Sequence, residues 1–118
     1  MAEPKRPDEP AELRRLRRRI DALDRRIVRL LNVRAELARE VGRAKTASGR
    51  RAIRDPERER EVLLRVSMAN EGPTPQADLL AIFKRLFAVA RGLERRDRTH
   101  ERPARPFGGV SRDEDTRS

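Results

Sequence analysis

Hydrophobic residues recur at intervals of three and four positions from about Ala11 to Ala47, which is the spacing of a long helix that packs along one seam. The seam comprises Leu13, Leu16, Ile20, Leu23, Ile27, Leu30, Leu37, Val41 and Ala44. A second stripe comprises Val28, Leu31, Ala35, Ala38 and Gly42. The apolar face is therefore broad, and the helix is expected to contact several neighbours.

Two shorter helices are predicted after the long one. Asp55 followed by Pro56 is a typical helix start, with a capping side chain and a proline in the first turn, and this helix runs to about Ala69. Thr74 followed by Pro75 predicts the start of the third helix for the same reason. The third helix carries Leu79, Ile82, Phe83, Leu86, Phe87, Ala90 and Leu93.

Three helices without an alternating strand pattern predict an all-α fold with one domain in the 118 residues. We expect the helical domain to span residues 11–98. Segments 1–10 and 99–118 are rich in Pro, Gly and charge and are expected to be flexible tails. The chain has no long uncharged apolar run and no signal peptide, which predicts a soluble cytoplasmic protein.

The first helix is too long for the other two to cover. At a rise of 1.5 Å per residue it would extend roughly 55 Å, whereas the shorter helices would extend about 20 to 35 Å. A monomer would leave a large apolar patch in water, which soluble proteins avoid. The sequence therefore predicts an intertwined helical homodimer, in which the long helices of two chains pack together.

Charged side chains interrupt the apolar stripes of all three predicted helices. Arg34 occupies the seam position at which the long helix should carry an apolar residue, and Lys45 lies on or beside the same broad face. Glu59 and Glu94 share faces with the hydrophobic residues of the second and third helices. Because a buried charge without a partner is costly, these groups should meet one another or a ligand. They form either a structural ion network or, as their number favours, a shared polar pocket.

Composition narrows the chemistry that such a pocket can perform. Cysteine is absent, and the single histidine, His100, lies in a polar segment, so thiolate chemistry is excluded and a histidine-based site is not favoured. The formal net charge of +10 makes nucleic acid a candidate partner. Interleaved acidic residues and an aromatic content of 3% argue against it. Of the 30 lysines and arginines, only Lys5, Lys45 and Lys84 are lysines. A lysine rather than an arginine at the inward position 45 therefore suggests that a compact point charge is needed there.

The stretch LRRRIDALDRRIVRLLNVRAELAREVGRAK, the loop after it and IRDPERERE resemble the all-helical chorismate mutases of the AroQ class. The similarity covers about residues 13–95, and its motifs are the IDALD opening, the arginine eleven residues before Lys45, and RDPERE. The substrate-binding residues that the resemblance implies are Arg17, Arg34, Lys45, Asp55, Arg58 and Glu59. The catalytic residues that it implies are Lys45, Glu94 and Arg34. Ala90 stands where the family commonly has serine.

The reaction implied by the resemblance is the rearrangement of chorismate to prephenate, an isomerisation on the branch towards phenylalanine and tyrosine. It is unimolecular and implies no cofactor and no metal. Arginine forks would clamp the two substrate carboxylates, and Lys45 would stabilise charge on the ether oxygen. Arg17 would reach into the pocket of the partner subunit of the homodimer.

Other functions remain open at this stage. An isochorismate pyruvate lyase or an amino-deoxychorismate mutase would use the same fold and a similar cationic pocket, and an activating partner enzyme is also compatible with the sequence. A different class of function is an arginine-rich helical module that binds nucleic acid or protein. From the sequence pattern alone, without the resemblance, Arg17 would be interpreted as a solvated arginine, Asp55 as a helix cap and Arg58 as a surface residue.

Overall fold

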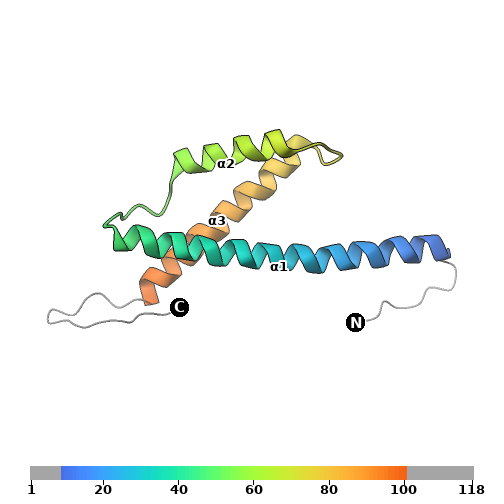
Figure 1. The fold of residues 1–118 in the computed structure, drawn as a ribbon, viewed down its shortest axis with the longest axis horizontal. Coiled ribbons are helices and arrows are strands. Elements are labelled where there is room, and N and C mark those ends of the chain that lie inside the picture. Colours follow the sequence, from blue (N-terminus) through green and yellow to red (C-terminus); the bar gives the residue numbers. More distant parts are fainter. Residues whose placement is uncertain (1–8, 101–118) are drawn as a thin grey trace. The chain divides into compact units, whose positions relative to one another are not determined.

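The structure is a computed structural model that describes residues 9–100, and these residues form three helices and no strand (Figure 1). The helices are α1 (Ala11–Ala47), α2 (Pro56–Ala69) and α3 (Gln76–His100). The all-α fold and the extents of the first two helices are as the spacing predicts. None of the described helices combines the length with the low charge that a membrane span requires.

The third helix differs slightly from the prediction at both ends. Its first hydrogen bond joins the Leu79 N–H to the Pro75 carbonyl at 3.0 Å, so the helix begins at Gln76, one residue after the predicted start. It continues to His100, beyond the expected end of the helical domain at residue 98. Residues 1–8 and 101–118, where most of the two expected tails fall, lie outside the described residues.

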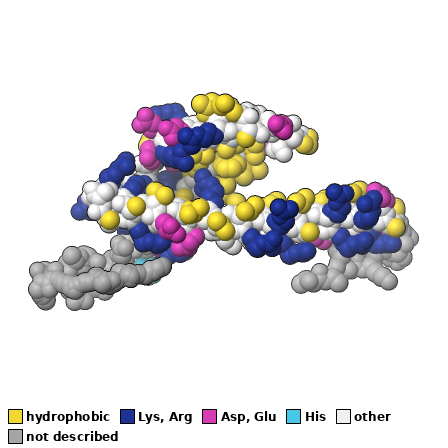
Figure 2. Space-filling model, in the orientation of Figure 1, with side chains coloured by type: hydrophobic (Ala, Val, Ile, Leu, Met, Phe, Trp, Pro, Cys, Tyr) yellow, Lys and Arg dark blue, Asp and Glu magenta, His cyan; other side chains and the backbone are white. Residues whose placement is uncertain are grey.

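The chain divides into two compact units, residues 1–36 and residues 37–118. The helix of the first unit is the N-terminal part of α1, and its hydrophobic side chains are exposed to solvent in a single chain (Figure 2). The large exposed hydrophobic residues of this part of α1 are Leu13, Leu16, Ile20, Leu23, Ile27, Val28, Leu30, Leu31 and Val33. The predicted apolar face is therefore present along the helix and remains accessible to a partner.

In the second unit, α2 and α3 pack side by side and run in opposite directions (Figure 1). Phe87 of α3 is the one buried hydrophobic side chain among residues 9–100, with 7% of its surface exposed. The half-buried hydrophobic residues of the two helices include Val62, Leu63, Val66, Leu79, Leu80, Phe83 and Leu86. The core of this unit is small, and it uses the faces that the hydrophobic spacing predicts.

Local signals determine where α2 begins and how the chain turns into α3. The Asp55 carboxylate accepts a hydrogen bond of 3.1 Å from the Arg58 N–H, and Pro56 occupies the first turn, as expected of a capped start. In the turn after α2, Gly72 has a φ of 79°, in the left-handed region that glycine adopts without strain. Its N–H donates to the Asn70 side-chain oxygen at 2.9 Å.

Candidate functional site

Lys45 and Glu94, two of the four inward-facing charges predicted from the sequence, lie together in the second unit. The Lys45 ammonium nitrogen is 3.6 Å from Oε1 of Glu94, and the two side chains are 12% and 8% exposed. The same ammonium donates a hydrogen bond of 3.3 Å to the carbonyl of Ile53, in the loop between α1 and α2. The lysine is therefore held in a fixed position that is largely shielded from water.

The absence of a side chain at Gly42 lets the Glu94 carboxyl lie against α1. A Cβ atom at residue 42 would be only 2.9 Å from Cγ of Glu94 and 3.2 Å from Cδ. Gly42 is itself buried, so the glutamate side chain has little room to move aside. A glycine one turn before Lys45 is thus part of what places the carboxyl beside the ammonium.

The Glu94 carboxyl is not fully satisfied within the described part of the chain. No donor there forms a hydrogen bond with its buried Oε1, and the Lys45 nitrogen at 3.6 Å is beyond hydrogen-bond distance. A buried acceptor without a donor loses stabilisation, so purely structural networks avoid this arrangement. Oε1 of Glu94 can therefore accept a further hydrogen bond.

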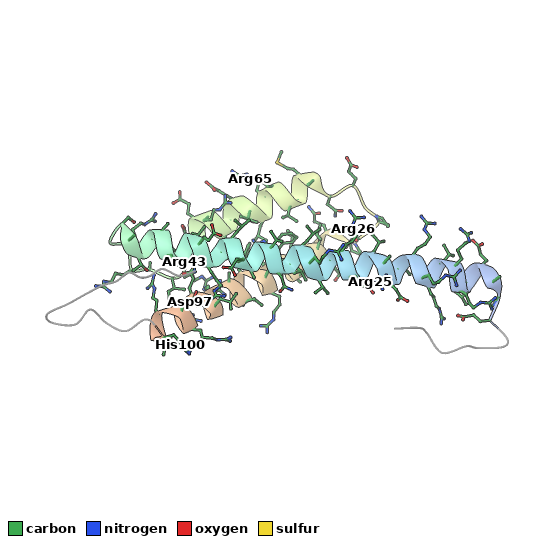
Figure 3. All side chains as sticks on the ribbon, turned by 60° about the horizontal axis from the view of Figure 1, so that its bottom comes forward. Arg25, Arg26, Arg43, Arg65, Asp97 and His100 are labelled. Atoms are coloured by element: carbon green, nitrogen blue, oxygen red, sulfur yellow. The ribbon has the colours of Figure 1, made fainter. Side chains whose placement is uncertain are left out.

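A further ion pair joins α1 and α3 near this site, between Arg39, six residues before Lys45, and Asp97, three residues after Glu94. The Nε and Nη2 atoms of Arg39 donate to the two carboxylate oxygens of Asp97, each at 3.0 Å. Figure 3 shows Arg43 of α1 and Asp97 of α3 in the same region of the molecule. Because a two-point contact fixes orientation as well as distance, the Arg39–Asp97 pair keeps Lys45 opposite Glu94.

Glu59 belongs to a second cluster, in an open cavity of about 240 Å³ between α2 and α3. The residues that line the cavity are Arg54, Pro56, Glu59, Arg60, Leu63, Lys84, Phe87 and Arg91. Nη1 of Arg91 donates a hydrogen bond of 2.5 Å to Oε2 of Glu59, and Nη2 of Arg54 lies 3.7 Å from Oε1. Four cations and one carboxylate thus line the cavity, which gives it a positive charge suited to an anionic ligand.

Asp55 and Arg58, at the start of α2, contact their own helix in this structure. Asp55 caps α2, and Arg58 lies 3.2 Å from Glu61 with 55% of its side chain exposed. Neither residue lines the cavity that contains Glu59. Their contacts are those of a helix cap and a surface residue.

Arg17 and Arg34 belong to the first unit, whereas Lys45, Glu59 and Glu94 belong to the second. Nη1 of Arg17 lies 2.8 Å from Oε2 of Glu9, and Arg34 is half-buried. The seam residues on either side of Arg34, Leu30 and Leu37, are 63% and 55% exposed.

The sequence prediction missed Arg91, which contributes the closest cation to Glu59. A signal for it was present, because Arg91 follows Phe87 by four positions and precedes Glu94 by three, which puts it on the same face of α3. In a chain with 30 lysines and arginines, this arginine could not be distinguished by sequence from the solvent-exposed ones.

Comparison with known proteins identifies the family. The model of the family "Chorismate mutase type II" matches residues 16–95, which is most of the chain. The chain belongs to this family. The resemblance found in the sequence is therefore confirmed, over nearly the same residues, and the chorismate mutase fold agrees with the three helices described above.

The curated relatives are bifunctional chorismate mutase/prephenate dehydratases. The protein of Aquifex aeolicus is 37% identical over 72% of this chain, and that of Stutzerimonas stutzeri is 39% identical over 73% of it. The matched region spans only 24% and 25% of the lengths of these two proteins. A solved chorismate mutase from Thermus thermophilus, form II, is 36% identical, with a TM-score of 0.68. The match covers 72% of this chain and 96% of that structure. This chain is thus similar to about a quarter of the bifunctional proteins, and to nearly all of a chorismate mutase chain.

We expect Gly42→Ala to destabilise the protein by about 1–3 kcal/mol relative to Gly92→Ala, because the added methyl group must displace the buried Glu94 side chain. Gly92 is the matched control: it lies in α3, and a Cβ atom there would meet nothing within 4 Å. Both variants gain the same helix propensity, so the difference isolates the contact. Urea unfolding at one fixed protein concentration measures it, and equal stabilities of the two variants would contradict the close packing.

Proposed function

We propose that this chain catalyses the rearrangement of chorismate to prephenate and does so as a homodimer. The observation that carries the proposal is the buried Lys45 ammonium beside Glu94, in a chain of the type II chorismate mutase family. The cationic cavity around Glu59 supports it further, because the substrate is a dianion.

The reaction breaks the carbon–oxygen bond of an ether as a carbon–carbon bond forms within the same molecule. No proton is transferred and no nucleophile is needed. The site therefore has to hold the flexible substrate in the compact conformer in which the two carbons meet. It also has to stabilise the negative charge that grows on the ether oxygen as the carbon–oxygen bond lengthens.

Lys45 is proposed to stabilise the ether oxygen. Its ammonium is already held by the Ile53 carbonyl and faces Glu94, so little reorganisation is required when charge develops. Shielding from water strengthens each electrostatic interaction at this position. Glu94 is proposed to approach the ether oxygen from the other side, beside the Lys45 ammonium.

The remaining predicted residues are proposed to bind the rest of the substrate. Arg34 and Lys45 would contact its carboxylates, and Arg17 would be supplied by a second copy of the chain. Asp55, Arg58 and Glu59 would surround its hydroxyl and ring; of these, Glu59 has the firmest support, because it lines the cavity. Bidentate arginines suit carboxylates, and the surplus of cations attracts a dianion from solution.

The homodimer is proposed because of the exposed hydrophobic face of α1. Ile20, Leu23, Ile27 and Leu30 are between 50% and 63% exposed in a single chain, although they follow one helical seam. A continuous apolar stripe of this length is a surface for another helix. The same stripe on a second copy fits it by symmetry.

The activity is tested by adding chorismate to purified protein and following the loss of its ultraviolet absorbance, with identification of the product. We expect prephenate, and we expect Lys45→Ala to lower turnover by about 100- to 1,000-fold, as removal of one oxyanion-hole donor does. Arg65→Ala, which removes an exposed cation from α2, is the control and should change turnover by less than about twofold.

Three outcomes would contradict the proposal. Release of pyruvate with an aromatic acid would identify a lyase instead. Full activity of the Lys45→Ala variant would remove Lys45 from the reacting centre. Steep salt-dependent DNA binding without any turnover would favour the nucleic-acid module.

The dimer is tested by sedimentation equilibrium, which should give twice the mass of one chain. Leu30→Glu places a charge on the exposed seam and should shift the protein towards monomer, because a buried charge without a partner is costly. Arg25→Glu on the same helix lies outside both apolar stripes and should leave the dimer intact (Figure 3). A monomeric wild-type protein, or equal effects of the two substitutions, would contradict this association.

A further inference from the structure

Arg91 of α3 forms a short, charged hydrogen bond with Glu59 of α2. Nη1 of Arg91 lies 2.5 Å from Oε2 of Glu59, and the two side chains are 21% and 17% exposed. Hydrogen bonds between ionised groups are among the strongest in proteins, and partial exclusion of water strengthens them further. This contact joins two helices that carry residues of the proposed site.

A second arginine near Glu59 is held much less firmly. Nη2 of Arg54 lies 3.7 Å from Oε1 of Glu59, beyond hydrogen-bond distance, and 65% of the Arg54 side chain is exposed. Its contribution is therefore screened by water, as for most surface ion pairs. Arg91 is the residue that determines the orientation of the Glu59 carboxylate.

Arg91 also lies between the two clusters of the site along α3. Phe87 precedes it by one helical turn and lines the cavity, and Glu94 follows it by one turn and faces Lys45.

We propose that Arg91 is a positioning residue that holds Oε2 of Glu59 and leaves Oε1 to accept a hydrogen bond from the substrate hydroxyl. This inference rests on the proposed function. The pairing has two effects in the cavity. It restricts the rotation of the carboxylate, so that one acceptor is oriented before substrate binds. It also offsets the negative charge of Glu59, which would otherwise repel a dianion that enters the cavity.

The test is a double-substitution cycle on the full chain, with kcat and KM for chorismate measured for wild type, Arg91→Gln, Glu59→Gln and the combined variant. We expect Arg91→Gln alone to lower kcat/KM by up to about 100-fold, the effect of a small misplacement in an active site. In the Glu59→Gln background the same substitution should change kcat/KM by less than about twofold, because its target is already altered.

Two further variants separate positioning from general effects. Arg85→Gln removes an exposed cation from the same helix and should stay within about twofold of wild type. Arg91→Lys keeps the charge but not the planar fork, and it should recover part of the activity lost in Arg91→Gln. Thermal unfolding of each variant shows whether it folds. If Arg91→Gln does not fold, Arg91→Lys takes its place: its loss of kcat/KM is measured once with Glu59 present and once with Glu59→Gln.

An equal loss on Arg91 substitution in both backgrounds would overturn the inference, because Arg91 would then act independently of Glu59. A loss no larger than that of Arg85→Gln would also overturn it. Both results can be obtained only if the wild-type protein is active. If the proposed function is wrong, the wild-type protein does not convert chorismate, so the two failures can be told apart. A wild type that neither binds nor converts chorismate would overturn both proposals.

Discussion

The contact between Lys45 and Glu94 is the interaction on which the rest of the site depends. Removing two charged groups from water costs several kcal/mol for each, and that cost is offset only if the groups are held in a favourable geometry. Gly42 gives the carboxyl the space to lie against α1, and the Arg39–Asp97 pair holds the two helices in register. Close packing at Gly42 and the Arg39–Asp97 pair thus keep the ammonium and the carboxyl together.

The arrangement of charge elsewhere in the second unit is consistent with an anionic ligand. The cavity between α2 and α3 is lined by four cations as well as Glu59, and the buried Phe87 also lines it. The long hydrophobic face of α1 is exposed in a single chain, and this exposure is the observation behind the proposed association with a second copy.

Much of this organisation could be predicted from the sequence, for identifiable physical reasons. Apolar residues must face a partner, so their spacing predicts α1 and α2 with the correct bounds. A charge on such a face needs a partner, and Arg34, Lys45, Glu59 and Glu94 were therefore expected to meet one another or a ligand. Lys45 and Glu94 do meet, whereas Glu59 pairs with Arg91 in a separate cluster. The start of α3 was one residue off: the Thr74 carbonyl accepts a hydrogen bond from the Asn70 side chain, and the Pro75 carbonyl accepts the first helical bond. Arg91 was missed because only the packing of α3 on α2 distinguishes it from the many solvated arginines. The roles of Arg17 and Arg34 remain predictions.

The central claim is that Lys45 and Glu94 face the ether oxygen of a bound dianion. The most direct test is a crystal structure of the protein with a bicyclic dicarboxylate ether that mimics the compact conformer of the substrate. We predict that the Lys45 nitrogen lies about 3 Å from the ether oxygen, with Glu94 in contact with the same atom. A ligand bound elsewhere, with the Lys45 nitrogen far from any ether oxygen, would contradict the claim.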